Sequence, residues 1–269
     1  MENFDIVIVG AGSAGCIITN QIIKNTNYKV LLIEAGPSDN NPVIQVPLGY
    51  GMTFYHKKMN WNFYSEIQKN LHNREIYYPR GKALGGSGSI NAMIYARGLR
   101  SDFENWDLSK NWSWENIKTS YDQIEFGVNE NIKILPPNKI PVNDVSKQHH
   151  PILKNFFDAS KDFDFTFNKQ LKSSIENQVG NYNVNIFKGF RTSSSKVFLK
   201  PIKNHPNLTI LTNTEVLKLN YENRKILSLN IKHKNKIITV KPKIGSILSS
   251  GSIMTPYLLL KSGIGNAKD

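Results

Sequence analysis

The sequence contains a single cysteine, Cys16, among its 269 residues. One cysteine can form neither a disulfide within the chain nor a cysteine-based metal site, so neither is available to stabilise the fold. Because Cys16 directly follows a glycine-rich turn, we expect a small buried residue and not a reactive thiol. No metal site of any other kind is predicted.

Long apolar runs are also lacking. Residues 6–23 carry no charged side chain, but glycines and the polar Thr19, Asn20 and Gln21 interrupt the stretch, so we predict no membrane span. The N-terminus has Glu2 and Asp5 where a signal peptide would carry positive charge. The sequence therefore indicates a soluble protein, and we expect it in the cytoplasm.

Acidic residues are few in comparison with basic ones. The chain has 34 lysines and arginines against 21 aspartates and glutamates, a formal net charge of +13. Such an excess raises nucleic acid as a partner. However, no aromatic side chain is interleaved among the late lysines of residues 232–243 to stack bases. We therefore expect no nucleic-acid partner; salt-dependent binding to DNA would instead support a basic binding module.

The first fifteen residues carry the clearest pattern. Residues 4–9 read as a buried strand that runs into Gly10-Ala11-Gly12-Ser13-Ala14-Gly15, the G-x-G-x-x-G turn of a dinucleotide-binding βαβ unit. Gly10 allows the tight bend, Gly12 lets the backbone approach a pyrophosphate, and Gly15 lets the next helix pack on the strand. The phosphates would lie at a helix N-terminus, where N–H groups and the helix dipole favour negative charge.

The segments that follow complete this unit. Residues 16–25 read as a helix, and residues 29–33 read as a second apolar strand that ends at Glu34. Glu34 lies about twenty residues beyond the turn, where a carboxylate accepts hydrogen bonds from ribose hydroxyls and repels a 2′-phosphate. The sequence therefore predicts a nucleotide site at this turn.

The rest of the chain predicts further elements. Residues 36–80 are rich in glycine, proline and aromatics, which is typical of an ordered, packed loop region. The second glycine cluster, residues 81–88, is expected to lead into a helix, and residues 102–125 carry helical spacing. Residues 127–150 are polar, and we expect them to form a mobile excursion or a departure from a regular fold. Apolar runs at 208–211, 216–221, 226–231 and 237–240 predict an antiparallel meander, followed by a buried strand at 244–251 and a helix.

Three separated segments together resemble the glucose-methanol-choline (GMC) family of flavin-dependent oxidoreductases. The first is the N-terminal turn through Glu34-Ala35-Gly36, the second runs from Pro79-Arg80-Gly81 to Asn91-Ala92-Met93, and the third runs from Gly251 to Gly265. Arg97-Gly98 with Asp102-Phe103 and Trp106 also fits the choline-dehydrogenase-like branch. The resemblance covers essentially the whole chain and is weakest over residues 127–150.

The resemblance implies an α/β fold. We expect a Rossmann-like FAD-binding domain with a parallel sheet and an antiparallel meander, together with part of a substrate or cap region. Residues 1–110 and 196–269 would form the discontinuous FAD-binding domain, and residues 111–195 the partial substrate or cap region.

The resemblance also implies FAD as the cofactor. Binding would be non-covalent, because Ile90 stands where some members carry the histidine that tethers the flavin. Small residues such as those at 85–87 suit a flavin, since backbone N–H groups can then lie beside its ring system. Leu84 and Val216, the latter expected beside the adenine through its backbone, can equally be core residues. The implied cofactor-binding residues are Gly10, Gly12, Ser13, Ala14, Gly15, Glu34, Ala35, Leu84, Gly85, Gly86, Ser87, Asn91, Ala92, Met93 and Val216.

The activity implied by the resemblance is the oxidation of an alcohol. A base takes the hydroxyl proton while the adjacent carbon gives hydride to the flavin N5, and histidine suits the role of the base. In the family this histidine lies in the C-terminal half, and the chain stops at Asp269, at about half the family's length. None of the six histidines takes the role by motif, so no catalytic residue is assigned: His56, His72, His149, His150, His205 and His233.

We therefore expect the FAD-binding half of an enzyme for a small-molecule alcohol, inactive alone. A truncated gene product is favoured over a split enzyme completed by a second polypeptide. A sheet cut before its final strand would expose an edge and reduce stability. An inactive flavin- or nucleotide-binding module stays an alternative. A nicotinamide-dependent dehydrogenase is disfavoured by the Gly-Gly-Ser loop and the late meander.

Overall fold

The computed structural model describes residues 3–104, 106, 110–129 and 131–266. The chain divides into two compact units, the first made of Met1–Asn91 with Ser193–Asp269 and the second of Ala92–Thr192. Their junctions follow Asn91 and Thr192, whereas the sequence predicts boundaries after residues 110 and 195. The assignment of these units to cofactor and substrate binding stays a prediction.

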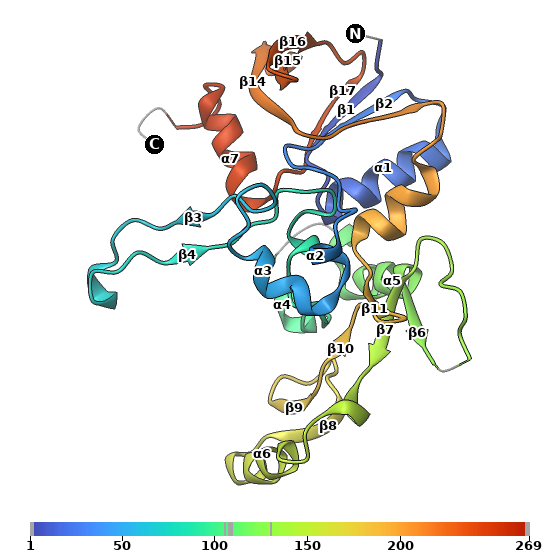
Figure 1. Ribbon diagram of the computed structural model, residues 1–269, viewed down its shortest axis with the longest axis vertical. Helices are drawn as coiled ribbons and strands as arrows, with labels where there is room; N and C mark the ends of the chain where they lie inside the picture. The colour runs from blue at the N-terminus through green and yellow to red at the C-terminus, as the bar shows by residue number, and fades with distance from the viewer. Residues whose placement is uncertain (1–2, 105, 107–109, 130, 267–269) are drawn as a thin grey trace. The chain divides into compact units, whose positions relative to one another are not determined.

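The first unit is built on a four-stranded parallel sheet (Figure 1). Its strands β1 (Ile6–Val9), β2 (Val30–Ile33), β13 (Leu208–Leu211) and β17 (Gly245–Leu248) lie in the order β13-β2-β1-β17. Helix α1 (Ser13–Asn25) joins β1 to β2, which confirms the predicted opening βαβ unit. All four residues of β2 are buried, as in parallel strands covered on both faces.

A three-stranded antiparallel meander completes the core of this unit. Strands β14 (Thr214–Glu222), β15 (Lys225–His233) and β16 (Lys236–Val240) pair in sequence order. Leu219, Leu229 and Ile231 of the meander are fully buried and share one apolar cluster with residues of β1 and β2. The prediction that residues 208–211 belong to the meander is wrong, because they form β13 of the parallel sheet. A four-residue apolar run has no periodicity that distinguishes parallel from antiparallel partners.

The remaining segments of the first unit are short. Residues 36–80 form an ordered region that ends in a two-stranded hairpin of β3 (Phe63–Tyr64) and β4 (Tyr77–Tyr78), which extends away from the sheet in Figure 1. The predicted helix after the second glycine cluster is wrong, because the chain there makes only a 3₁₀ turn. Gly85 and Gly86 have positive φ values of 87° and 59°, which no α-helix contains. The elements are α2 (Pro42–Gln45), η1 (Pro47–Gly49), α3 (Tyr50–Thr53), β3 (Phe63–Tyr64), η2 (Lys69–Leu71), β4 (Tyr77–Tyr78), η3 (Gly86–Ser89), η7 (Ser195–Leu199, a π-helix), η8 (Lys200–Ile202) and α7 (Gly251–Lys261).

The second unit contains a mixed four-stranded sheet in the order β5-β10-β7-β6. Residues 127–150, expected as a mobile excursion, supply the end of β6 and all of β7, so that prediction is wrong. The helical spacing over residues 102–125 corresponds to two helices, α4 and α5. The elements are β5 (Ile94–Tyr95), α4 (Arg100–Glu104), η4 (Lys110–Trp112), α5 (Trp114–Ile124), β6 (Glu125–Val128), β7 (Ile140–Asp144), η5 (Ser146–Gln148), α6 (Leu153–Ser160), η6 (Lys161–Phe163), β8 (Thr166–Gln170), β9 (Gln178–Asn181), β10 (Asn183–Val184), β11 (Ile186–Phe187) and β12 (Phe190–Arg191).

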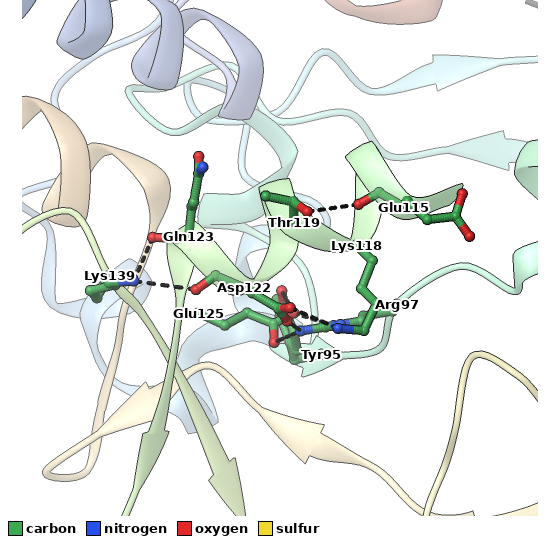
Figure 2. Close-up of polar contacts among 9 residues, drawn as sticks. All are labelled: Tyr95, Arg97, Glu115, Lys118, Thr119, Asp122, Gln123, Glu125 and Lys139. Carbon is green, nitrogen blue, oxygen red and sulfur yellow. Dashed lines mark hydrogen bonds and ion pairs between the residues drawn. The ribbon is translucent and has the colours of Figure 1, made fainter. Parts of the chain in front are cut away.

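A charged cluster links the end of α5 to the strand β5 (Figure 2). The Nε of Arg97 donates to Oε1 of Glu125 at 2.7 Å, and its Nη2 donates to Oδ1 of Asp122 at 2.6 Å. The Tyr95 hydroxyl donates to the same Glu125 Oε1 at 2.7 Å. Hydrogen bonds to the two carboxylates raise the pKa of Arg97, and burial raises the pKa of Tyr95. Arg97, from the segment that resembles the choline-dehydrogenase branch, therefore joins the end of β5 to the end of α5.

Replacement of Glu125 with glutamine should destabilise the protein by about 2 kcal/mol. The amide has no second oxygen to accept from the Nη2 of Arg97, as Oε2 does, and it carries no charge to pair with the guanidinium. Urea unfolding of the variant and the wild type would measure this. The control is Glu104→Gln, whose pair with Arg100 is half exposed and should leave the unfolding midpoint nearly unchanged. Equal midpoints for Glu125→Gln and Glu104→Gln would contradict the prediction.

Among the residues that the structure describes, no helix is both long and apolar enough to cross a membrane.

Candidate functional site

A cavity of about 640 Å³ lies in the first unit, where the C-terminal ends of β1 and β2 meet the start of α7. In parallel sheets, ligands bind at this edge of the strands. We call it the nucleotide cavity. Nine of the predicted cofactor-binding residues line it: Gly10, Gly12, Ser13, Ala14, Glu34, Ala35, Gly86, Ser87 and Val216.

The N-terminal turn forms one wall of the nucleotide cavity. Helix α1 begins at Ser13, with Gly12 as its N-cap residue. The first turn of a helix has N–H groups without intrahelical partners, and Ser13 and Ala14 bring this turn to the cavity. The hydroxyl of Ser249, the residue after β17, supports the turn by donating to the Gly10 carbonyl at 2.7 Å. Cys16 is buried directly beneath, as predicted, and burial raises the pKa of its thiol.

The second glycine cluster meets this turn backbone to backbone. The Gly85 N–H donates to the Ala11 carbonyl at 2.8 Å. A Cβ atom added at Gly86 would lie 2.7 Å from the Cα of Gly12, and Gly86 has a positive φ of 59°. Only glycine fits both conditions. Two loops separated by about seventy residues of sequence therefore form one continuous surface.

Glu34 joins the end of β2 to the N-terminal turn. Its side chain is buried, and its Oε2 and Oε1 accept hydrogen bonds of 2.9 Å from the N–H groups of Ala11 and Gly36. Burial raises the pKa of Glu34, while these N–H donors and the positive charge of Lys82 oppose the increase. Each carboxylate oxygen has a second lone pair, so Glu34 can still accept from a ligand in the cavity.

The other predicted cofactor residues do not line the cavity. Gly15 packs under the turn against the Gly10 carbonyl, and the N–H groups of Leu84 and Asn91 donate to Pro37 and Ser87. Gly85 instead donates its N–H to the Ala11 carbonyl. Ala92 and Met93 belong to the second unit, where the Met93 carbonyl accepts from the Asn185 N–H at 2.9 Å. A role for these residues at the cofactor stays a prediction.

Several cavity-lining residues were not found from the sequence. Trp61 and Phe63, from the base of the hairpin, stack with their ring centroids 5.8 Å apart and line the cavity together with Arg80. Residues 36–80 contain many aromatic side chains, and their composition does not indicate which of them reach the cavity. Residues 249–256 also line the cavity. They lie largely within the third resembling segment, which was a usable signal.

The cavity combines features that suit a dinucleotide. A helix N-terminus can accept phosphates, a carboxylate can accept hydrogen bonds from hydroxyls, and aromatic rings can pack against a planar ring. Its volume falls within the range of small-molecule sites. Among the described residues that line it, none is a histidine.

Comparisons with known proteins agree with this geometry. Residues 4–269 match the family model described as GMC oxidoreductase. The chain is 36% identical over 276 residues to an alcohol dehydrogenase (acceptor) of Pseudomonas putida, covering 99% of this chain and 49% of that protein. It is 28% identical to the mitochondrial choline dehydrogenase of Mus musculus, covering 100% of this chain and 46% of that protein.

A solved structure shows the same fold. The pyridoxine 4-oxidase from Mesorbium loti superimposes with a TM-score of 0.90 at 29% identity, covering 99% of this chain and 53% of that one. The chain thus spans about half the length of the relatives it matches. On the strength of the family match and these two converging loops, the chain belongs to the GMC oxidoreductase family.

Proposed function

We propose that this chain is the FAD-binding N-terminal half of an FAD-dependent oxidoreductase that acts on the CH–OH group of an alcohol. The observation that carries the proposal is the contact of the Gly86 loop with the Gly12 turn beside the carboxylate of Glu34. The names of the relatives, alcohol and choline dehydrogenases, support alcohols as the substrate class.

The residues of the nucleotide cavity fit FAD. Ser13 and Ala14 would hold the pyrophosphate at the start of α1, and Glu34 with Ala35 would hold the ribose. Val216 would lie beside the adenine, and Gly86 and Ser87 would lie beside the flavin. When bound, FAD supplies an acceptor for hydride from the carbon that bears the hydroxyl. We propose non-covalent binding, because the alkyl side chain of Ile90 cannot form a bond to the flavin.

The general base is proposed to come from outside this chain. A base near neutral pKa is needed to take the hydroxyl proton, and none of the described residues lining the nucleotide cavity is a histidine. We propose that a C-terminal half, in a longer chain or as a separate polypeptide, supplies it. The same observation favours a second candidate, a flavin-binding module without catalytic activity.

Titration of the purified chain with FAD and with NAD tests the proposal. We expect tighter binding of FAD than of NAD, and we expect acid precipitation to release all of the flavin into solution. Alcohol should bleach the flavin absorbance only after the complementary half is added. Tighter binding of NAD than of FAD would refute the FAD assignment. Flavin that stays with the precipitated protein would refute non-covalent binding. If alcohol still fails to bleach the flavin after the complementary half is added, the inactive flavin-binding module is favoured.

A further inference from the structure

The base of the β3–β4 hairpin keeps the antiparallel register of its strands, although Asn62 interrupts the pairing with a positive φ of 53°. Asn60 lies opposite Gly81, and Phe63 lies opposite Tyr78, in one continuous register. The Trp61 N–H donates to the Arg80 carbonyl at 2.9 Å, and the Lys82 N–H donates to the Met59 carbonyl at 2.8 Å. In this register Trp61 and Lys82 are diagonal neighbours on the same face, a spacing at which long and aromatic side chains touch.

The side chains of this diagonal pair are in contact. The Nζ atom of Lys82 lies 4.2 Å from the centroid of the Trp61 ring. This is well inside the ~6 Å range of cation–π attraction. Trp61 and its stacked neighbour Phe63 line the nucleotide cavity, whereas Lys82 does not. Lys82 therefore lies outside the cavity lining and in contact with one of its aromatic residues.

The backbone of Lys82 also packs against the loop that carries Glu34. A Cβ atom added at Gly36 would lie 1.8 Å from the Lys82 carbonyl oxygen, and the Leu84 N–H donates to the Pro37 carbonyl at 3.0 Å. Gly36 is the residue whose N–H donates to Glu34. The ammonium group of Lys82 thus lies over an aromatic wall of the cavity, while its backbone packs on the loop that follows the buried carboxylate. The charge of Lys82 also lowers the pKa of Glu34.

We propose that Lys82 is a positioning residue of the nucleotide cavity, which fixes Trp61 as the aromatic wall and balances the charge of Glu34. This inference rests on the proposed FAD binding. A wall held in place before binding costs less ordering of side chains when a planar ring packs against it. A carboxylate that keeps its charge remains a hydrogen-bond acceptor for ribose hydroxyls.

The proposal predicts a change in pH dependence. Burial raises the pKa of Glu34 and the charge of Lys82 lowers it. Removal of Lys82 should therefore raise the pKa of Glu34 further. Glu34 then becomes protonated at a higher pH than in the wild type, so acidification should weaken FAD binding at a higher pH. Other titratable groups around Glu34 are the buried thiol of Cys16 and, lining the same cavity, Arg80 and Glu215. The thiol does not interfere, because burial raises its pKa.

The experiment measures the FAD dissociation constant of the purified chain from about pH 5 to about pH 8, where proteins tend to be most stable. Lys82→Met should weaken binding about tenfold at neutral pH and move the acid-side loss of affinity to higher pH. Lys82→Arg keeps the charge and can stack on Trp61, so it should restore most of the affinity and the wild-type pH profile. The matched control is Lys261→Met, which removes a cation 5.4 Å from the Tyr257 ring and outside the cavity lining.

Coupling between the two side chains tests the role of Trp61. Trp61→Leu should weaken FAD binding. Lys82→Met should then reduce FAD affinity less in the Trp61→Leu variant than it does in the wild type. The Trp61→Leu variant also tests the aromatic wall if Lys82→Met fails to fold. Wild-type affinity and pH profile in Lys82→Met, or undiminished FAD affinity in Trp61→Leu, would overturn the inference while leaving FAD binding intact. Failure of the wild type to bind FAD would refute the proposed function itself.

Discussion

Gly86→Ala should weaken FAD binding by about a hundredfold or more. The added Cβ would lie 2.7 Å from the Cα of Gly12, and the backbone at Gly86 has a φ of 59°. The contact is between two backbones, so no side chain can rotate away. The Gly-Gly-Ser loop must then move off the N-terminal turn, and the surface shared by the two loops is lost.

Isothermal titration with FAD would measure this loss, with thermal unfolding recorded in parallel. The matched control is Gly51→Ala, because a Cβ there meets no atom within 4 Å and its backbone is in an ordinary conformation. Gly51→Ala should bind FAD as the wild type does. Comparable affinities in the two variants would show that the contact between the loops does not shape the FAD site.

The opening βαβ unit was predictable because several local signals agree. The apolar run of β1, the glycine turn and the carboxylate at the end of β2 lie at the spacing that one supersecondary unit requires. Strand β13 was misassigned because its four residues pair with β2, which lies about 180 residues earlier in the sequence. Such long-range pairing leaves no trace in a short apolar run.

The predicted helix after the second glycine cluster failed for a different reason. The sequence alone does not reveal that Gly85 and Gly86 adopt positive φ angles to reach the N-terminal turn. The prediction of a mobile excursion over residues 127–150 fails because β7 pairs with β6 and β10 through its backbone. The polar side chains of this segment give no sign of that pairing. In both cases tertiary contacts override the local pattern.

The sequence predicted many of the residues that line the nucleotide cavity, but not its aromatic side chains or the hydrogen bonds of Glu34. Glu34 was expected only as an acceptor for ribose hydroxyls, yet it also accepts the N–H groups of Ala11 and Gly36. A bond between residues 23 positions apart in sequence can be inferred only once the turn is folded. Trp61 reaches the cavity through the pairing of residues 59–64 with residues 77–82, which composition does not indicate.

Glu34→Gln should weaken FAD binding roughly fiftyfold, because bonds to a charged acceptor are the stronger ones. An amide has one acceptor oxygen, so its NH₂ group would face the N–H of either Ala11 or Gly36. The turn would loosen, and the acceptor for the ribose would be lost. The matched control is Glu215→Gln, which removes an acid from the lining of the same cavity and should cost much less affinity.

The same variant should change how stability depends on pH in the absence of FAD. Burial raises the pKa of Glu34 in the folded state, so the folded protein binds this proton more tightly than the unfolded chain. Glu34 therefore contributes a decrease in stability as the pH rises from the unfolded pKa, about 4.3, to the folded pKa. Glutamine does not titrate, so urea unfolding of Glu34→Gln across this window should lack that decrease. If the wild type and Glu34→Gln show parallel stability curves while FAD affinity still falls, Glu34 acts as a ligand acceptor whose burial carries no electrostatic cost.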